Sequence, residues 1–242
     1  MTVMKTSNHT IPDQTLPRST RTAPPAVQQD RGVKYATGAP SKILGRDNIT
    51  IGTWNTRTLR AAGKRQELTH KMDRYRWNIL GLSEMRWKNF GETTTEEGHK
   101  VFFSGKEDKH KHSVGFLVHK DIVNTVMGCH PVSSRLITIR LRAVPFNIKI
   151  VQAYAPTSDY DDNEVEEFYD QLQNVIDETL KNILVVQGDL NAKVGSDACG
   201  NWQGICGPFC KDDTNERGLR LLEFATFNEL VLVNTFGHHK AS

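Results

Sequence analysis

The sequence predicts an α/β (α+β) fold in which two β-sheets pack as a sandwich and helices cover both outer faces, four layers in all. Three observations support this prediction. The apolar run Ile183–Val186 is typical of a strand buried on both faces. Successive segments between Lys100 and Tyr154 show mostly alternating polarity or β-branched residues, which indicates antiparallel strands. Apolar residues recur at helical spacing in residues 64–77, 161–180 and 216–229.

The chain of 242 residues is long enough for one large α/β domain. Residues 1–47 are rich in Thr, Pro, Ser and Gln and contain hardly any aromatic side chains. Such a segment cannot bury enough apolar surface to offset the entropy that ordering costs. We therefore expect a disordered tail over residues 1–47 and a single domain over residues 48–242.

Composition restricts the class of protein and the compartment. Hydrophobic residues make up 37% of the chain and charged residues 24%, as in a soluble globular protein. No apolar run approaches the roughly 20 residues that a membrane helix needs, and no secretory signal precedes the domain. We expect an intracellular protein, in the nucleus or the cytoplasm, without a membrane partner. The net charge of +3 is compatible with a nucleic-acid partner but does not decide the matter, and the oligomeric state is left open.

The cysteines are expected to be reduced, without disulfides, because they are few and lie in no secreted context. They are Cys129, Cys199, Cys206 and Cys210. The last three precede His238 and His239, which makes a zinc site an alternative. Paired C-x-x-C ligand spacing is missing, however, so the sequence favours free thiols.

The first half of the domain is predicted to begin with a strand, Ile49–Trp54, that leads into a loop at Asn55. A helix should follow over Lys64–Trp77, and its inner face should carry Leu68, Met72 and Tyr75. Strand Ile79–Leu82 comes next, and a loop rich in Thr and Glu is expected over Glu92–Gly98. The strands expected after it are Lys100–Ser104, Ser113–His119, Val123–Met127, Arg135–Arg142 and Phe146–Tyr154.

The second half is predicted to contain two helices that flank a buried strand. The acidic, amphipathic segment Asp161–Leu180 should cover one face of the sheet. After the strand that ends at Asp189, a helix is expected over Glu216–Glu229, followed by a strand over Val231–Asn234. The residues expected on the inner face of this last helix are Leu219, Leu222, Phe224 and Phe227.

The segment Asn182–Val194, N-I-L-V-V-Q-G-D-L-N-A-K-V, carries the first candidate site residues. Residues two apart on an extended chain point the same way, so the Asp189 carboxylate and the Asn191 amide should face one pocket. Gly188 would keep the approach to that pocket open. The alternative is a strand that ends in an ordinary polar turn, because Gly, Asp and Asn are common turn residues.

Other apolar runs also end in a polar residue that could bind a metal ion or orient a phosphate. Ile51–Leu59 reads I-G-T-W-N-T-R-T-L and contains Asn55, and Ile79–Trp87 reads I-L-G-L-S-E-M-R-W and contains Glu84. Together with V-Q-A-Y-A-P-T at Val151–Thr157, the order W-N, S-E, A-Y-A-P, G-D-L-N resembles the endonuclease/exonuclease/phosphatase superfamily. Within it the sequence is most similar to apurinic-site endonucleases and the endonuclease domains of non-LTR retrotransposons. The motifs T-W-N-T-R-T-L, S-E-M-R-W and N-E-R-G-L-R-L-L-E-F most resemble those of the craniofacial development protein 2 group, which derives from such a retrotransposon.

This resemblance implies a DNase I-like four-layer fold and a phosphodiesterase that acts on DNA with Mg²⁺ or Mn²⁺. It implies that Glu84 is a metal ligand supported by Asn55, and that Asp189 activates water. Asn191 and Tyr154 then contact the phosphate or assist the leaving group. Arg135 and Asn215 match family positions that face the substrate.

Each of these residues also has a purely structural interpretation. Glu84 could be a surface charge, Asn55 a turn residue and Tyr154 a half-buried strand aromatic. Arg135 could form a surface salt bridge, and Asn215 could cap the helix that follows it. His110 and His112 have no acidic partner at a useful spacing, so they are not predicted to be ligands.

The sequence departs from the superfamily pattern at its end, where an Asp and an Asp-His pair are missing. We therefore expect a fold that lacks its last strands and a sheet edge left without a partner. Loss of a positioned general acid or oxyanion donor typically costs about 10²–10⁴-fold in rate. Activity of this chain should then be weak or absent, and the alternatives are a non-catalytic descendant that binds nucleic acid or protein, or a phosphatase.

Overall fold

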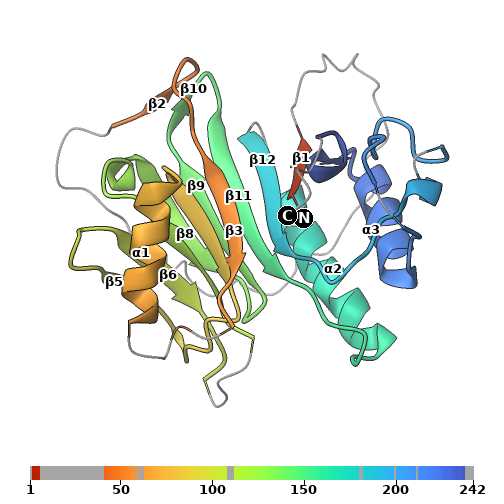
Figure 1. Cartoon of the computed structure of the whole chain (residues 1–242), viewed down its shortest axis with the longest axis horizontal. Coiled ribbons are helices and arrows are strands. Elements are labelled where there is room, and N and C mark those ends of the chain that lie inside the picture. Colours follow the sequence, from red (N-terminus) through yellow and green to blue (C-terminus); the bar gives the residue numbers. More distant parts are fainter. Residues whose placement is uncertain are drawn as a thin grey trace, which may run out of the picture.

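Two large β-sheets form the centre of the molecule (Figure 1). This computed structural model describes residues 2–5, 41–57, 59, 63–107, 112–179, 182–198, 200–210 and 212–237. The six-stranded sheet has the order β13 (Val231–Leu232), β1 (Thr2–Lys5), β12 (Asn182–Asp189), β11 (Asn147–Tyr154), β9 (Leu136–Leu141), β8 (Val126–Pro131). The five-stranded sheet has the order β3 (Ile51–Asn55), β4 (Ile79–Ser83), β7 (Val114–Val118), β6 (Lys100–Ser104), β5 (Phe90–Thr94). A short parallel pair joins β10 (Ala143–Val144) to β2 (Ile43–Leu44).

Helices cover the outer faces of the two sheets. Helix α1 (Lys64–Arg74) packs Leu68 and Met72 on the five-stranded sheet. Helices α2 (Asp162–Asp177) and α3 (Glu216–Phe227) lie on the six-stranded sheet, on the opposite side of the molecule from α1 (Figure 1). Single 3-10 turns occur at η1 (Val123–Thr125), η2 (Ser196–Ala198) and η3 (Val233–Thr235). The predicted α/β architecture of stacked sheets and flanking helices is confirmed for the described residues.

The apolar core between the sheets explains why the strands read as unbroken hydrophobic runs. Phe116 of β7 and Ile150 of β11 are fully buried in this layer, together with Ile139 of β9. Every residue of β4 and β7 is buried, because one face packs on the second sheet and the other on α1. Strands that are buried on both faces have no polar side to alternate with.

A buried polar contact connects the sheets near the carboxyl ends of their central strands. The side-chain amide of Gln152 donates to Ser83 Oγ at 2.9 Å and to Thr53 Oγ1 at 3.2 Å. Gly81 of β4 makes this approach feasible, because a Cβ there would collide with the side chains of Gln152 and Gln187. These two glutamines are register partners on β11 and β12. The absence of a side chain at residue 81 therefore brings the ends of the two sheets together.

Several predicted elements need correction. Disorder over the whole of residues 1–47 is wrong, because Thr2–Lys5 forms β1 between β12 and β13 and Ile43–Leu44 forms β2. These short strands depend on distant partners, which local composition does not reveal; residues 6–40 lie outside the described residues. Part of the loop predicted over Glu92–Gly98 belongs to β5, where pairing with β6 overrides the low strand propensity of Gly91 and Glu92.

The predicted strand Val123–Met127 is also wrong at its start. Its first three residues form η1, in which Thr125 donates both its amide and its hydroxyl to the Ile122 carbonyl, and β8 begins only at Val126. Strand β6 occupies Lys100–Ser104 as predicted. At the other end of the domain, only Val231–Leu232 of the predicted last strand is a strand, and Val233–Thr235 is the turn η3.

Two predicted inner helix faces contain exposed residues. Tyr75 follows α1 as its C-cap, is 51% exposed and stacks on Trp77 at 4.9 Å between ring centroids. On α3, Leu219 and Phe227 are exposed, whereas Leu221 and Ala225 are buried with Leu222 and Phe224. The prediction favoured the largest apolar side chains. The packed face instead includes the small Ala225, which is fully buried.

Candidate functional site

Four of the predicted site residues meet where the carboxyl ends of parallel strands from both sheets lie close together. Asn55 ends β3, and Glu84 directly follows its parallel neighbour β4. Tyr154 and Asp189 are register partners at the ends of β11 and β12. Because parallel strands end at a common edge, each sheet contributes two polar side chains to one place.

The Asn55 amide connects the two carboxylates. Its Nδ2 donates to Glu84 Oε1 at 2.6 Å and lies 3.3 Å from Asp189 Oδ2. Its Oδ1 accepts the Arg57 backbone amide at 3.1 Å. Asn55 therefore presents a nitrogen donor, which cannot bind a cation, to two carboxylates that can. In this arrangement it orients Glu84 and Asp189 toward each other.

The phenol of Tyr154 completes the cluster. Its Oη donates to Glu84 Oε1 at 3.3 Å, and the side chain is 7% exposed. Burial, followed by the negative charge of Glu84, raises the pKa of Tyr154 to about 12. At neutral pH Tyr154 is therefore a protonated hydrogen-bond donor within the site.

Backbone conformation at this edge is unusual. Glu84 has φ +56° and Asn191 has φ +45°, in the left-handed region that L-residues other than Asn and Asp rarely adopt. Such conformations persist where surrounding structure holds them, and they cluster at functional sites. At Gly188, φ is +138° and a Cβ would collide with the Ala153 backbone. Only glycine fits between β12 and β11 at that position.

Asn191 and Arg135 flank the cluster. The Asn191 side chain donates to the Ala155 carbonyl at 2.7 Å, and its backbone amide donates to Asp189 Oδ1 at 3.3 Å. Arg135 Nη1 donates to the Tyr154 carbonyl at 3.2 Å. The guanidinium carbon lies 4.7 Å from the ring centroid of Tyr160. Because a guanidinium has five N–H donors, this single bond leaves it able to contact an anion.

Asn215 lies elsewhere, at the start of α3. Its Oδ1 accepts the Gly218 amide at 2.8 Å and the Lys193 amide at 3.1 Å. Asn215 is therefore the N-cap of α3, the role that the sequence left open beside substrate binding. Within the described part of the chain, the Asn215 side chain makes no hydrogen bond to the Glu84 cluster.

Two aromatic neighbours of the site were missed from the sequence. His112 stacks on Tyr154 at 5.8 Å between centroids, and its Nε2 lies 2.6 Å from Tyr160 Oη. No acidic residue near His112 in the sequence suggested a role for it, whereas its partners are tyrosines 42 and 48 positions further along the chain. His110 lies outside the described residues. No local pattern signals contacts of this range.

The donor atoms at this edge fit a hard divalent cation. Glu84 and Asp189 supply carboxylate oxygens, and both are partly exposed, so water can complete a coordination shell. Mg²⁺ and Mn²⁺ prefer oxygen ligands and retain several waters. Among the described residues, Cys129, Cys206 and Cys210 pack in the apolar cores and not in this cluster, while Cys199, His238 and His239 lie outside the described residues. Among the described residues, no helix is long and apolar enough to cross a bilayer.

The sequence is similar to two known proteins that share one name. Craniofacial development protein 2 of Bos taurus is 37% identical over 201 residues, which are 82% of this chain and 33% of that protein. The protein of the same name from Tragulus javanicus is 36% identical over 191 residues, 78% of this chain and 32% of its own length. The chain spans about a third of the length of these curated relatives. No family model matches.

Two solved structures have a fold similar to that of this chain. The endonuclease domain of TRAS1, a telomere-specific non-LTR retrotransposon, superposes with a TM-score of 0.52 at 17% identity, over 75% of this chain and 71% of that domain. The apurinic endonuclease LMAP of Leishmania major gives a TM-score of 0.51 at 15% identity, over 73% and 65% of the two chains. The chain has the endonuclease/exonuclease/phosphatase fold. It is also a homologue of craniofacial development protein 2. The resemblance read from the four motifs is thereby confirmed at the level of the superfamily fold.

Proposed function

We propose that this chain is a phosphodiesterase domain that cuts DNA with Mg²⁺ or Mn²⁺ bound at Glu84 and Asp189. The observation that carries the proposal is the Asn55 amide, which holds two carboxylates from separate sheets at one point beside a protonated tyrosine. Two negatively charged groups held together without a cation repel each other, so a site of this kind is suited to bind one. Both carboxylates remain open to solvent on one side.

The chain's own residues would divide the chemistry in the following way. A bound divalent cation would neutralise the phosphate oxygens and polarise phosphorus. Asp189 would accept the proton of the attacking water, while Glu84 anchors the cation. Tyr154, whose pKa of about 12 keeps its hydroxyl protonated, would donate a hydrogen bond to the leaving oxygen or the phosphate. Asn55 would keep the carboxylates aligned, as it does in the structure.

The donors that would hold the phosphate lie around this cluster. Arg135 supplies a guanidinium next to Tyr154, and guanidinium groups match the geometry of phosphate oxygens. Asn191 supplies an amide on the other side of Asp189. DNA is the proposed substrate because TRAS1 and LMAP, whose folds are similar, are endonucleases. Asn215 is proposed to act in this function through the α3 cap that positions Lys193, not through direct contact with the substrate.

The test is nicking of a supercoiled plasmid by the purified chain in Mg²⁺. We expect Glu84→Gln and Asp189→Asn each to reduce the nicking rate by about 100-fold or more, which is typical when a charge-stabilising group is removed. Glu67→Gln is the matched control, because it makes the same carboxylate-to-amide change at an exposed position of α1. It should nick as fast as the wild type.

Nicking that persists in EDTA, or that is unchanged in Glu84→Gln, would contradict the proposal. A chain that binds DNA in EDTA, with affinity falling steeply as salt increases and without any cleavage, would favour a non-catalytic nucleic-acid-binding role. Hydrolysis of a small phosphomonoester in preference to plasmid would favour a phosphatase.

A further inference from the structure

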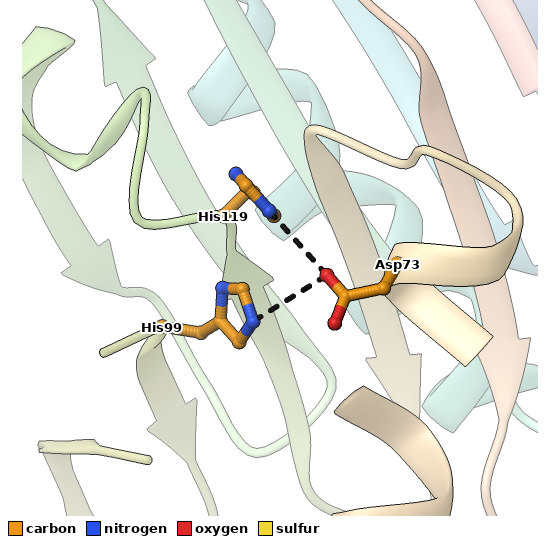
Figure 2. Close-up of side chains that lie close together, drawn as sticks. All are labelled: Asp73, His99 and His119. Carbon is orange, nitrogen blue, oxygen red and sulfur yellow. Dashed lines mark ion pairs between the residues drawn. The ribbon is translucent and has the colours of Figure 1, made fainter. Parts of the chain in front are cut away.

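Two histidines and an aspartate meet at the opposite end of the five-stranded sheet from Glu84. Asp73 lies in the last turn of α1, His99 directly precedes β6, and His119 directly follows β7. Figure 2 shows the Asp73 carboxylate pointing toward both imidazole rings, whose centroids lie 4.6 Å apart. Asp73 Oδ1 lies 3.8 Å from His99 Nε2 and 3.5 Å from His119 Nε2. One ligand atom from each of the three residues lies within 4.8 Å of the other two.

The buried histidine lacks a partner for its outer nitrogen. His99 is 1% exposed, and its Nε2 has no hydrogen-bond partner. A separation of 3.8 Å from Asp73 is too long for a hydrogen bond. Burying an unsatisfied polar nitrogen costs free energy, so its position facing Asp73 and His119 needs an explanation.

We propose that Asp73, His99 and His119 form a binding site for Zn²⁺ or a similar transition-metal ion. Two ligands held at about 2.0–2.1 Å in tetrahedral geometry lie about 3.3–3.4 Å apart. The distances of Asp73 Oδ1 from the two imidazole nitrogens, 3.5 and 3.8 Å, need to contract by only a few tenths of an ångström to match. The Asp73 side chain is 59% exposed, so water can occupy the fourth position.

The hydrogen bonds on the far side of each ring define the proton shift that binding requires. The backbone amide of Lys120 lies 3.2 Å from His99 Nδ1, and that of Asp121 lies 3.3 Å from His119 Nδ1. Both rings therefore carry their proton at Nε2 before the metal binds. Metal binding at Nε2 moves each proton to Nδ1, and the number of protons on the rings does not change.

The surroundings can accept this shift. Asp121 Oδ2 lies 3.4 Å from His119 Nδ1 and can accept the new N–H, the carboxylate–histidine–metal arrangement that supports many zinc ligands. At His99 the Lys120 amide must turn away, and because Lys120 is exposed that amide can bind water instead. Loading is thus expected to displace the turn at Lys120 and Asp121 and to leave the strands in place.

The donor set separates this site from the Glu84 cluster. Imidazole nitrogens suit zinc, cobalt, nickel and copper, whereas Mg²⁺ prefers oxygen alone. The His119 amide donates to the Asn78 carbonyl at the start of β4, and Glu84 follows the end of that strand. Six residues of extended chain separate the two positions by about 20 Å. One ion cannot contact both clusters.

The experiment measures binding of Zn²⁺ alone to the EDTA-stripped full chain by isothermal titration calorimetry. We expect one site in the wild type, and in Asp73→Asn and His119→Gln a weakening at least as large as the roughly 10–100-fold loss seen when outer-shell partners are removed. His70→Gln is the matched control, because His70 is an exposed histidine on the same helix. It should bind Zn²⁺ as the wild type does.

Two further readouts identify the ligands. Imidazole ¹⁵N shifts of His99 and His119 should change from the Nε2–H to the Nδ1–H tautomer as Zn²⁺ is added. Co²⁺ substitution should give a visible spectrum without a thiolate charge-transfer band, because no cysteine is involved. Equal Zn²⁺ affinity in the wild type, Asp73→Asn and His119→Gln, a thiolate band with Co²⁺, or no Zn²⁺ uptake by folded wild type would each overturn the proposal. Circular dichroism confirms that the variants are folded.

Discussion

The two ends of strand β4 carry clusters of opposite character. At its carboxyl end, Glu84 and Asp189 present oxygens that Asn55 already satisfies with hydrogen bonds. At its amino end, His99 presents a buried nitrogen that has no hydrogen-bond partner. A carboxylate pair held by an amide keeps its geometry when a weakly held cation leaves. An unsatisfied buried imidazole is stabilised when a strongly held cation is present. From the two proposals we expect an exchangeable cation at one end and a resident one at the other.

The largest expected effect is a reciprocal loss of function at the two ends. Glu84→Gln should lower Mg²⁺-dependent nicking by about 100-fold or more and leave Zn²⁺ binding by Asp73, His99 and His119 unchanged. Asp73→Asn should do the reverse, since Asn78 and Glu84, which flank β4 beside the two clusters, lie about 20 Å apart. Plasmid nicking and calorimetry on the same two preparations test this. If one substitution impaired both readouts in a folded protein, the two clusters would form a single functional unit.

Zinc should also stabilise the fold. An ion that binds only the folded state at 100 times its Kd adds about 2.7 kcal/mol to the free energy of unfolding. We expect this increase in the wild type and His70→Gln but not in Asp73→Asn, and we expect Mg²⁺ at equal concentration to give little. Urea unfolding followed by circular dichroism measures it. An equal Zn²⁺ effect in Asp73→Asn would place the ion elsewhere.

The sequence predicted the first cluster because each of its residues ends a recognisable strand. Asn55, Glu84 and Asp189 follow apolar runs, and a parallel arrangement brings such ends together. The role of Asn215 could not be decided in advance, because N-caps and substrate-binding loops use the same residue types. The histidine cluster had no local signature. Its members are 26 and 20 residues apart, and only the order of strands in the sheet brings them together.

The fold shows the same division between local and distant information. The periodicity of α2 and the unbroken run of β12 were sufficient to locate these elements within a few residues. Strand β1 was not predicted, because the strands that pair with it, β12 and β13, lie more than 170 residues away in the sequence. The exposure of Leu219 and Phe227 was not predicted, because hydrophobicity alone does not determine which side of a helix packs on the sheet.

A substitution at Gly81, midway along β4, tests whether the stability of the protein depends on the close approach of the two sheets. Gly81→Ala places a Cβ against the side chains of Gln152 and Gln187, and overpacking of this kind costs about 1–3 kcal/mol. Gly200→Ala is the control, because a Cβ there meets nothing within 4 Å. Urea unfolding compares the two. A Gly81→Ala protein as stable as the wild type would show that the glutamines can move aside without cost.

The smallest expected effect is a change in the pKa of Tyr154. Glu84→Gln removes a negative charge that, after burial, contributes most to raising the pKa of Tyr154 to about 12, so that pKa should fall toward its usual value of about 10. The folded wild type holds the phenol proton more tightly than the unfolded chain does. Its contribution to stability is therefore complete below about pH 10 and is lost as pH rises toward 12. Asp73→Asn should leave this titration unchanged, because Asp73 lies at the far end of β4. NMR titration of tyrosine labelled with ¹³C at Cζ measures both variants, and equal pKa values in Glu84→Gln and the wild type would mean that burial alone keeps Tyr154 protonated.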